Sequence, residues 1–171
     1  MEKNTFKEVK FSVQMTAGAM FDFMYWHSYH GFSGVVNYAF SLAGLVALLA
    51  GFGGENPAVK LALTALALLF TVINPLILYY KSVRQIKNTV MFQKPLEYKF
   101  DTRGFTISQE GQSDNAKWNT IILIRETRKN LILYMGAANA MILPKKDMGD
   151  QEAELKKLIR AALPELSKKL K

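Results

Sequence analysis

GVVNYAFSLAGLVALLAGFG, residues 34–53, runs without a single charged side chain and decides how the chain is organised. A helix of about 20 apolar residues spans a hydrocarbon core of roughly 30 Å. A second apolar segment, 58–80, follows after a short polar turn, and Pro57 suits the first turn of its helix. The two segments predict a transmembrane helical hairpin over residues 34–80. The alternative is a pair of buried helices in a soluble core, but the rest of the chain offers little to bury both.

Charge is concentrated on both flanks of this hairpin, in a chain of 171 residues with a formal net charge of +8. The flanking basic residues are Lys81, Arg84, Lys87 and Lys94 after the second span and Lys3, Lys7 and Lys10 before the first. Because positive residues favour the cytoplasmic side, we expect a multi-pass membrane protein with both termini in the cytoplasm. The absence of cysteine excludes disulfides, thiolate metal sites and thiol nucleophiles.

Small residues recur at every fourth position of the first span and predict its packing face: Ala39, Ala43, Ala47 and Gly51. Such stripes let helix backbones approach closely in lipid. Asn74-Pro75 interrupts the second span, and because proline has no amide hydrogen, the Thr71 carbonyl should lose its helical partner. We expect either a kink satisfied by a nearby hydroxyl or amide, or a gating or binding position.

Residues 1–33 predict a strand near Phe11 followed by an amphipathic helix at the cytoplasmic interface. Aromatic residues at both ends of the hairpin are typical of a membrane-interface belt: Tyr25, Trp26, Tyr29, Tyr79 and Tyr80. His27 and His30 can meet on adjacent helical turns as metal ligands or act as a pH-sensitive contact. No third ligand converges on them in the sequence, so we expect neither a metal nor another cofactor.

The remainder predicts a basic juxtamembrane helix over 81–94 and a small β-rich domain over 95–171. Alternating or apolar runs indicate strands at 96–101, 105–109, 116–127, 130–135 and 140–144. Asp150 should cap a closing helix whose apolar face carries Leu155, Leu158 and Ile159. The expected fold class is membrane α+β: a two-helix hairpin with an antiparallel sheet or half-open barrel, which the strand near Phe11 joins.

Three stretches resemble the YcxB-like bacterial membrane proteins: EVKFSVQMTAGAMFDFMYWHSYH, FTISQEGQSDNAKWNTIILIRETRKNLILYM and AMILPKKDM. The strongest parts are the tryptophan strand with Glu126-Thr127 and the basic Pro144-Lys145-Lys146. The resemblance implies a two-span protein of the bacterial cell membrane with a pleckstrin-homology-like cytoplasmic domain. It carries over no reaction, and therefore no catalytic residues.

No Gly-rich phosphate loop or Gly-x-Ser-x-Gly elbow is present, so we expect a protein that is not an enzyme. Two basic groups are candidate contacts for anionic lipid or a protein partner: Lys81, Arg84 and Lys87 beside the membrane, and Arg128, Lys129, Lys145 and Lys146 at the mouth of the sheet. Ordinary topology control is the alternative role of the first group. Nucleic acid is not expected as a partner. Alternative functions are a small homo-oligomeric transport or immunity component and a His-dependent metalloenzyme.

Overall fold

The computed structural model describes residues 8–136 and 139–170, and its contacts divide the chain into two units. One unit comprises the chain up to Phe23 together with the chain from Gln85 onward, and the other is Met24–Arg84. The N-terminal strand therefore belongs with the C-terminal domain, rather than with the segment before the first span as the predicted division at residue 33 has it. Lys3 and Lys7, used in the orientation argument, lie outside the described residues.

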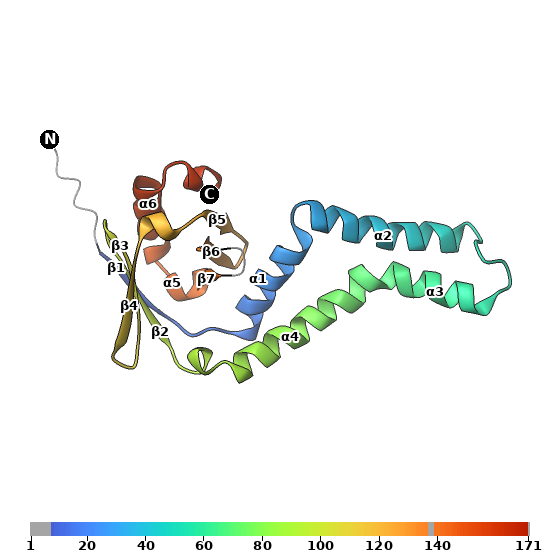
Figure 1. Ribbon diagram of the computed structural model, residues 1–171, viewed down its shortest axis with the longest axis horizontal. Helices are drawn as coiled ribbons and strands as arrows, with labels where there is room; N and C mark the ends of the chain where they lie inside the picture. The colour runs from blue at the N-terminus through green and yellow to red at the C-terminus, as the bar shows by residue number, and fades with distance from the viewer. Residues whose placement is uncertain (1–7, 137–138, 171) are drawn as a thin grey trace. The chain divides into compact units, whose positions relative to one another are not determined.

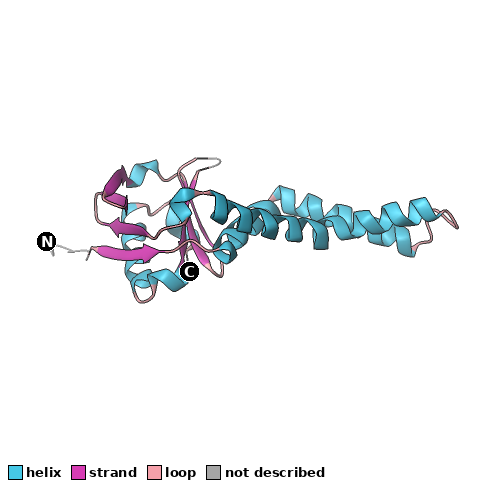
Figure 2. Ribbon diagram, turned by 90° about the horizontal axis from the view of Figure 1, so that it is seen from below, coloured by secondary structure: helices cyan, strands magenta, loops and turns pink. Residues whose placement is uncertain are grey.

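The first unit contains two antiparallel sheets (Figures 1 and 2). The four-stranded sheet has the order β1-β2-β3-β4, with β1 Val9–Val13, β2 Leu96–Phe100, β3 Gly104–Gln109 and β4 Gln112–Lys117. The three-stranded sheet has the order β5-β6-β7, with β5 Leu123–Glu126, β6 Asn130–Tyr134 and β7 Ala140–Pro144. These strands confirm the mixed α+β class with antiparallel pairing.

β1 and β2 are neighbours in the sheet although the whole hairpin separates them in the chain. They pair in register from Val9 opposite Phe100 to Val13 opposite Leu96. All four of these side chains are buried, because alternate residues of both strands face the core. Residues 14–95 are thus an insertion into the connection between two adjacent antiparallel strands, and the prediction that the strand near Phe11 joins this sheet is confirmed.

The predicted strand over 116–127 is wrong in its middle. β4 ends at Lys117, and Trp118–Thr120 form a 3₁₀ turn before β5 begins. The Trp118 ring lies 5.9 Å from that of Phe100, and its Nε1 donates to the Asp101 carbonyl at 2.9 Å. The chain turns here because the indole is buried against the first sheet. β4 was not predicted as a separate strand because its side chains are almost all polar and exposed.

Two helices, α5 Lys145–Met148 and α6 Gln151–Ala162, and a short 3₁₀ helix, Leu166–Lys169, complete this unit. Leu155, Leu158 and Ile159 of α6 are fully buried, which confirms its predicted apolar face. Asp150 does occupy the N-cap position, but its side chain makes no capping hydrogen bond. Its backbone is already helical (φ −65°, ψ −14°), whereas a capping residue needs an extended conformation to reach back to the first amides.

Helices account for nearly all of the second unit: the end of α1 Ala17–Tyr29, α2 Phe32–Leu49, α3 Pro57–Leu68, a π-helix Leu69–Ile73 and most of α4 Asn74–Asn88. Phe32–Leu49 and Pro57–Asn88 are long and apolar enough to cross a membrane. Large apolar side chains such as Val35, Leu61 and Leu76 are 69%, 71% and 64% exposed, so they do not form a core within the described chain. α1 does not segregate polar from apolar side chains, contrary to the predicted amphipathic helix.

The packing face of α2 differs from the predicted alanine stripe. Ser41 and Gly44 are buried against the second helix, and a Cβ on Gly44 would lie only 2.8 Å from the Ala67 amide nitrogen. Ala39, Ala43 and Gly51 are exposed, and Ala47 is half-buried. A four-residue repeat rotates by about 40° at each step around a helix of 3.6 residues per turn, so such a stripe leaves the contact line.

Candidate functional site

A cavity of about 380 Å³ lies in the first unit where three separated segments meet. Its walls are Thr16, Gly18, Ala19, Arg128, Lys129, Asn130, Pro144, Lys145 and Lys146. All four basic residues that the sequence places at the mouth of the sheet therefore border one cavity. They come from the β5–β6 turn and from the junction of β7 with α5.

The β5–β6 turn presents two of these cations at its tip. The Thr127 amide donates to the Asn130 carbonyl at 2.9 Å, and the Asn130 amide donates to the Thr127 hydroxyl at 2.8 Å. The closed turn leaves Arg128 and Lys129 exposed as its two central residues. Neither side chain makes an ion pair with any residue in the described ranges, so both positive charges face solvent uncompensated.

The first turn of α1 supplies the opposite wall. Thr16 caps the helix, since its hydroxyl oxygen accepts from the Ala19 amide at 3.3 Å. The amide of Gly18 lies within the first helical turn, where no intrahelical carbonyl is available to it and the helix dipole is positive. A Cβ built on Gly18 would meet nothing within 4 Å, so this wall borders open space.

A buried polar clamp joins α1 to the turn. Asp22 Oδ2 accepts from the Thr127 hydroxyl at 2.5 Å and from Asn130 Nδ2 at 2.7 Å. Asn130 Nδ2 also donates to the Ala19 carbonyl at 3.0 Å, while Oδ1 of this fully buried residue has no hydrogen-bond partner among the described residues. Sequence reasoning missed this clamp because more than 100 positions separate its partners; a polar Asn opening an otherwise apolar strand was its only signal.

Lys145 is not the free cation that the sequence suggested. Its ammonium pairs with the Glu126 carboxylate and lies 3.5 Å from that of Glu152. Lys156 donates to the same two carboxylates, at 2.8 Å and 2.6 Å. The Glu126 side chain is only 6% exposed, so these four residues form a nearly buried ion network. The unpaired charge of the cavity therefore comes from Arg128 and Lys129. Lys146 adds a third cation, which forms a longer ion pair with Asp147 at 3.8 Å.

The network keeps Lys156 charged. Burial by itself would lower the pKa of its ammonium, but the hydrogen bonds that it donates to Glu126 and Glu152 outweigh this and raise the pKa above its ordinary value. The motifs Glu126-Thr127 and Pro144-Lys145-Lys146, which carry the family resemblance, thus meet in space. Glu126 and Lys145 hold the walls of the cavity together, and Thr127 closes its turn.

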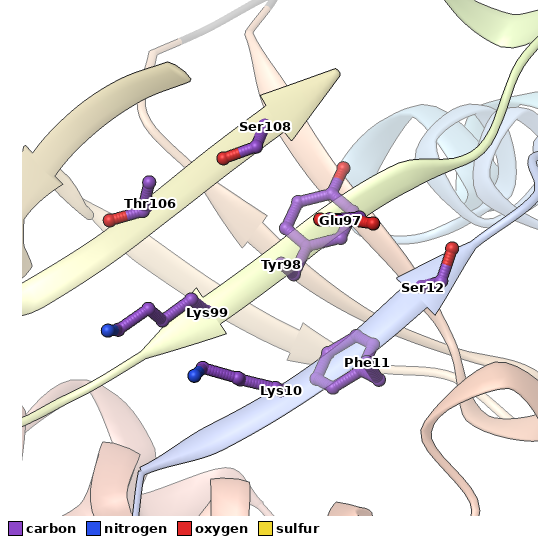
Figure 3. Close-up of a pocket in the computed structure, with 8 residues that line it drawn as sticks. All are labelled: Lys10, Phe11, Ser12, Glu97, Tyr98, Lys99, Thr106 and Ser108. Atoms are coloured by element: carbon purple, nitrogen blue, oxygen red, sulfur yellow. The ribbon is translucent and has the colours of Figure 1, made fainter. Parts of the chain in front are cut away.

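A second cavity of similar size lies on the outer face of the first sheet (Figure 3). Lys10 and Lys99 lie on adjacent strands with their ammonium groups extended in the same direction. Both pair with Glu8, at 2.5 Å and 2.7 Å, and their hydrogen bonds lower the pKa of that carboxyl. Because Glu8 and Glu97 balance these two lysines, this face offers an anion less net charge than the cavity at the β5–β6 turn.

The hairpin unit contains a polar cluster around the π-helix. The Asn74 backbone amide donates to the Leu69 carbonyl, five residues back. In the same register residue 75 would donate to the Phe70 carbonyl, but Pro75 has no amide hydrogen. The Tyr29 hydroxyl donates to the Phe70 carbonyl at 2.5 Å and accepts from Asn74 Nδ2 at 3.0 Å. The expected hydroxyl is present, but Tyr29 satisfies the Phe70 carbonyl rather than that of Thr71, and the Asn74 side-chain amide donates to this hydroxyl instead of to a carbonyl.

Ser41 completes this cluster from α2. Its hydroxyl lies between two groups that would bond to each other in a regular helix, accepting from the Phe70 amide at 3.3 Å and donating to the Leu66 carbonyl at 3.4 Å. Such an insertion into the hydrogen-bond ladder is a recognised cause of helix distortion. The irregular backbone at the middle of the second apolar helix is therefore satisfied by side chains from α1 and α2.

The aromatic residues predicted as an interface belt differ in their exposure. Tyr79 and Tyr80 are exposed, and Tyr25 and Trp26 are half-buried. Tyr29 is only 7% exposed and is a packing residue of the polar cluster, which corrects its assignment to the belt. Among the hairpin-flanking cations, Lys81, Arg84 and Lys87 are all exposed on α4 at three-residue spacing.

His27 and His30 do not assemble a metal site in the part of the chain that the structure describes. No group of three His, Cys, Asp or Glu side chains converges there. The His30 ring stacks on Trp26 with centroids 4.5 Å apart, and its Nδ1 lies 3.0 Å from the Trp26 carbonyl. These contacts within one helical turn account for the placement of His30.

The family model of the YcxB-like protein matches residues 100–159, from the end of β2 into α6. No curated protein matches the chain. The matched segment contains the β5–β6 turn, the Glu126–Lys145 pair and the cavity cations Arg128, Lys129 and Lys146. The resemblance read from the sequence is therefore confirmed over residues 100–159, where this chain is similar to the YcxB-like family.

Proposed function

We propose that this chain is a non-enzymatic membrane protein whose helical hairpin holds a pleckstrin-homology-like domain at the cytoplasmic face, where the domain binds a phosphate-bearing anionic lipid headgroup. The observation that carries the proposal is the convergence of Arg128, Lys129 and Lys146 on one cavity. Cationic side chains and first-turn helix amides are the groups with which proteins bind phosphate.

The arrangement of strands supports the pleckstrin-homology-like fold. A four-stranded and a three-stranded antiparallel sheet are followed by a helix whose apolar face is buried. In this arrangement the hairpin replaces the loop between the first two strands. The comparison concerns architecture alone, and the binding role rests on the cavity itself.

The pairing of β1 with β2 supports a topology in which the chain segments before and after the hairpin lie on the same side of the membrane. These strands form a continuous antiparallel ladder, so Val13 and Leu96 must share a compartment, and two spans between them satisfy this condition. The absence of cysteine allows the topology to be mapped with single introduced thiols.

A thiol at Glu55, in the turn of the hairpin, should react with a membrane-impermeant maleimide in intact cells. A thiol at Ser113, exposed on β4, should react only after the inner membrane is opened. The cysteine-free parent chain serves as the control. Labelling of Ser113→Cys in intact cells would overturn the proposed orientation. A denatured sample run in parallel checks that both introduced thiols can react with the maleimide.

Replacement of Arg128, Lys129 and Lys146 by glutamine should weaken the binding of anionic lipid at least tenfold. Each cation near an anionic surface contributes about 1 kcal/mol, and 1.4 kcal/mol corresponds to tenfold. Native mass spectrometry of the full chain in detergent, with phosphatidylglycerol against phosphatidylcholine, measures the retained lipid.

The matched control for this triple variant replaces Lys117, Lys157 and Lys168 by glutamine, which removes the same charge from exposed positions elsewhere. Equal losses in both triple variants would contradict a local site. Unchanged lipid binding in the cavity variant, together with loss of a cross-linked protein neighbour in native membranes, would assign the cavity to a protein partner instead.

A further inference from the structure

The Thr127 hydroxyl is the central group of the β5–β6 turn. Its oxygen accepts from the backbone amides of Lys129 at 3.2 Å and Asn130 at 2.8 Å. A hydroxyl has one proton, and its lone pairs serve these two amides only while that proton points elsewhere. The nearest acceptor for the proton is Asp22 Oδ2 on α1, at 2.5 Å, whereas the Asn130 carbonyl lies 3.2 Å away. The conformation of the turn therefore depends on a carboxylate that lies 105 positions away in the chain.

Both hydrogen bonds that Asp22 accepts converge on a single oxygen. Oδ2 receives the Thr127 hydroxyl and, at 2.7 Å, Asn130 Nδ2. The same nitrogen donates to the carbonyl of Ala19, a residue that lines the cavity, at 3.0 Å. Asn130 is fully buried, so water does not replace these bonds when they break. The clamp thus fixes the β5–β6 turn to the wall of the cavity that α1 provides.

The clamped turn carries two cations of the cavity, Arg128 and Lys129, as its exposed central residues. A loose turn would have to be ordered when an anion binds, and a turn that is fixed beforehand avoids this cost. We infer that Asp22 is the positioning residue of the cavity: through Thr127 it holds the turn so that both cations face the same anion. This inference rests on the proposed function and adds the residue that sets its affinity.

Two matched pairs of variants keep or remove the same hydrogen bonds. Asp22→Asn keeps the clamp, because one amide oxygen can accept both bonds that Oδ2 accepts, whereas Asp22→Ala removes them. Thr127→Ser keeps the hydroxyl, and Thr127→Val replaces it by a methyl group of similar size. Because all four changes lie outside the cations themselves, any effect on anion binding must act through the turn or through the stability of the fold.

Asp22→Ala and Thr127→Val should each weaken the retention of phosphatidylglycerol about tenfold, since ordering the backbone of one residue on binding costs roughly this factor. Asp22→Asn and Thr127→Ser should match the parent. Native mass spectrometry of the full chain in detergent, with phosphatidylcholine as the reference lipid, measures retention. Limited trypsin digestion reports the turn without any lipid: cleavage after Arg128 and Lys129 should become faster in the same two variants only.

A double-mutant cycle distinguishes positioning from a general loss of stability. In the background Arg128→Gln, Lys129→Gln the turn carries no cation, and Lys146, which is not on the turn, provides the residual binding. Asp22→Ala should then lower lipid retention less than twofold further, although it still lowers the midpoint of thermal unfolding. A further tenfold loss in this background would show that Asp22→Ala damages the fold as a whole, and would overturn the inference.

The remaining outcomes separate the inference from the function on which it rests. If Asp22→Ala and Thr127→Val retain the lipid while the triple glutamine variant of the three cations loses it, the positioning role is overturned and the proposed site stands. A loss in Asp22→Asn as large as in Asp22→Ala overturns the hydrogen-bond mechanism. Retention that the triple variant leaves unchanged overturns the proposed function itself. If Asp22→Ala does not fold, the comparison of Thr127→Val with Thr127→Ser decides the inference.

Discussion

Glu126→Ala should destabilise the β-rich unit by about 3 kcal/mol, the cost typical of removing one partner from a buried ion pair. The carboxylate is 6% exposed and pairs with both Lys145 and Lys156, whose side chains are 23% and 11% exposed. Its removal leaves two largely buried ammonium groups, which then share the Glu152 carboxylate. Thermal unfolding of the full chain in detergent, followed by circular dichroism, should show a midpoint lower by roughly 10 °C.

Glu154→Ala is the matched control for this experiment. Glu154 pairs with Lys157 on the same helix, but both side chains are about half exposed, so the loss should stay below about 0.5 kcal/mol. The double variant Glu126→Ala, Lys156→Met should be more stable than Glu126→Ala alone, because it also removes a stranded charge. Purely additive losses in the double variant would contradict a coupled network.

Tyr29→Phe should destabilise the hairpin unit by about 3 kcal/mol, because it leaves the Phe70 carbonyl and the Asn74 amide group without their partner. In the proposed bilayer setting no water is available to replace the hydroxyl, and an unsatisfied backbone group there costs several kcal/mol. Titration of the full chain from mild detergent into SDS, followed by helical ellipticity, measures the change. Tyr80→Phe, at a side chain that is 66% exposed, should change stability little.

The variant Pro75→Ala tests whether the Tyr29 hydroxyl acts through the Phe70 carbonyl. An alanine at position 75 restores an amide hydrogen that can bond to a carbonyl one turn back, so the Tyr29 hydroxyl is no longer the sole source of a donor. Tyr29→Phe should therefore cost less in the Pro75→Ala background than in the parent chain. The same cost in both backgrounds would show that Tyr29 acts through its ring packing instead of the hydroxyl.

Much of the architecture could be predicted from local patterns. The long apolar segments of the hairpin, the alternating strands β1 and β2, and the apolar face of α6 all produce strong local signals, and the structure has these elements near their expected bounds. β4 and the turn at Trp118 could not be predicted, because a polar edge strand has no apolar alternation and a buried indole bends the chain for a tertiary reason.

The residues of the candidate site were likewise only partly predictable from the sequence. Arg128, Lys129 and Lys146 were found as basic residues flanking turns, but the sequence counted Lys145 with them, and only the structure shows its charge paired with Glu126. The alanine stripe of α2 failed for a related reason. Small residues mark many possible contact lines on a helix, and the partner helix selects the line through Ser41 and Gly44.

By itself, the sequence determined the elements whose formation depends on neighbouring residues: two long apolar helices, short alternating strands, and basic turns. The tertiary structure decided which distant groups neutralise, satisfy or crowd one another. Asp22 with Asn130, Glu126 with Lys156, and Tyr29 with Phe70 are each pairs far apart in the chain. Hydrogen bonds and ion pairs act over a few ångströms in space, and no spacing along one strand or helix can encode them.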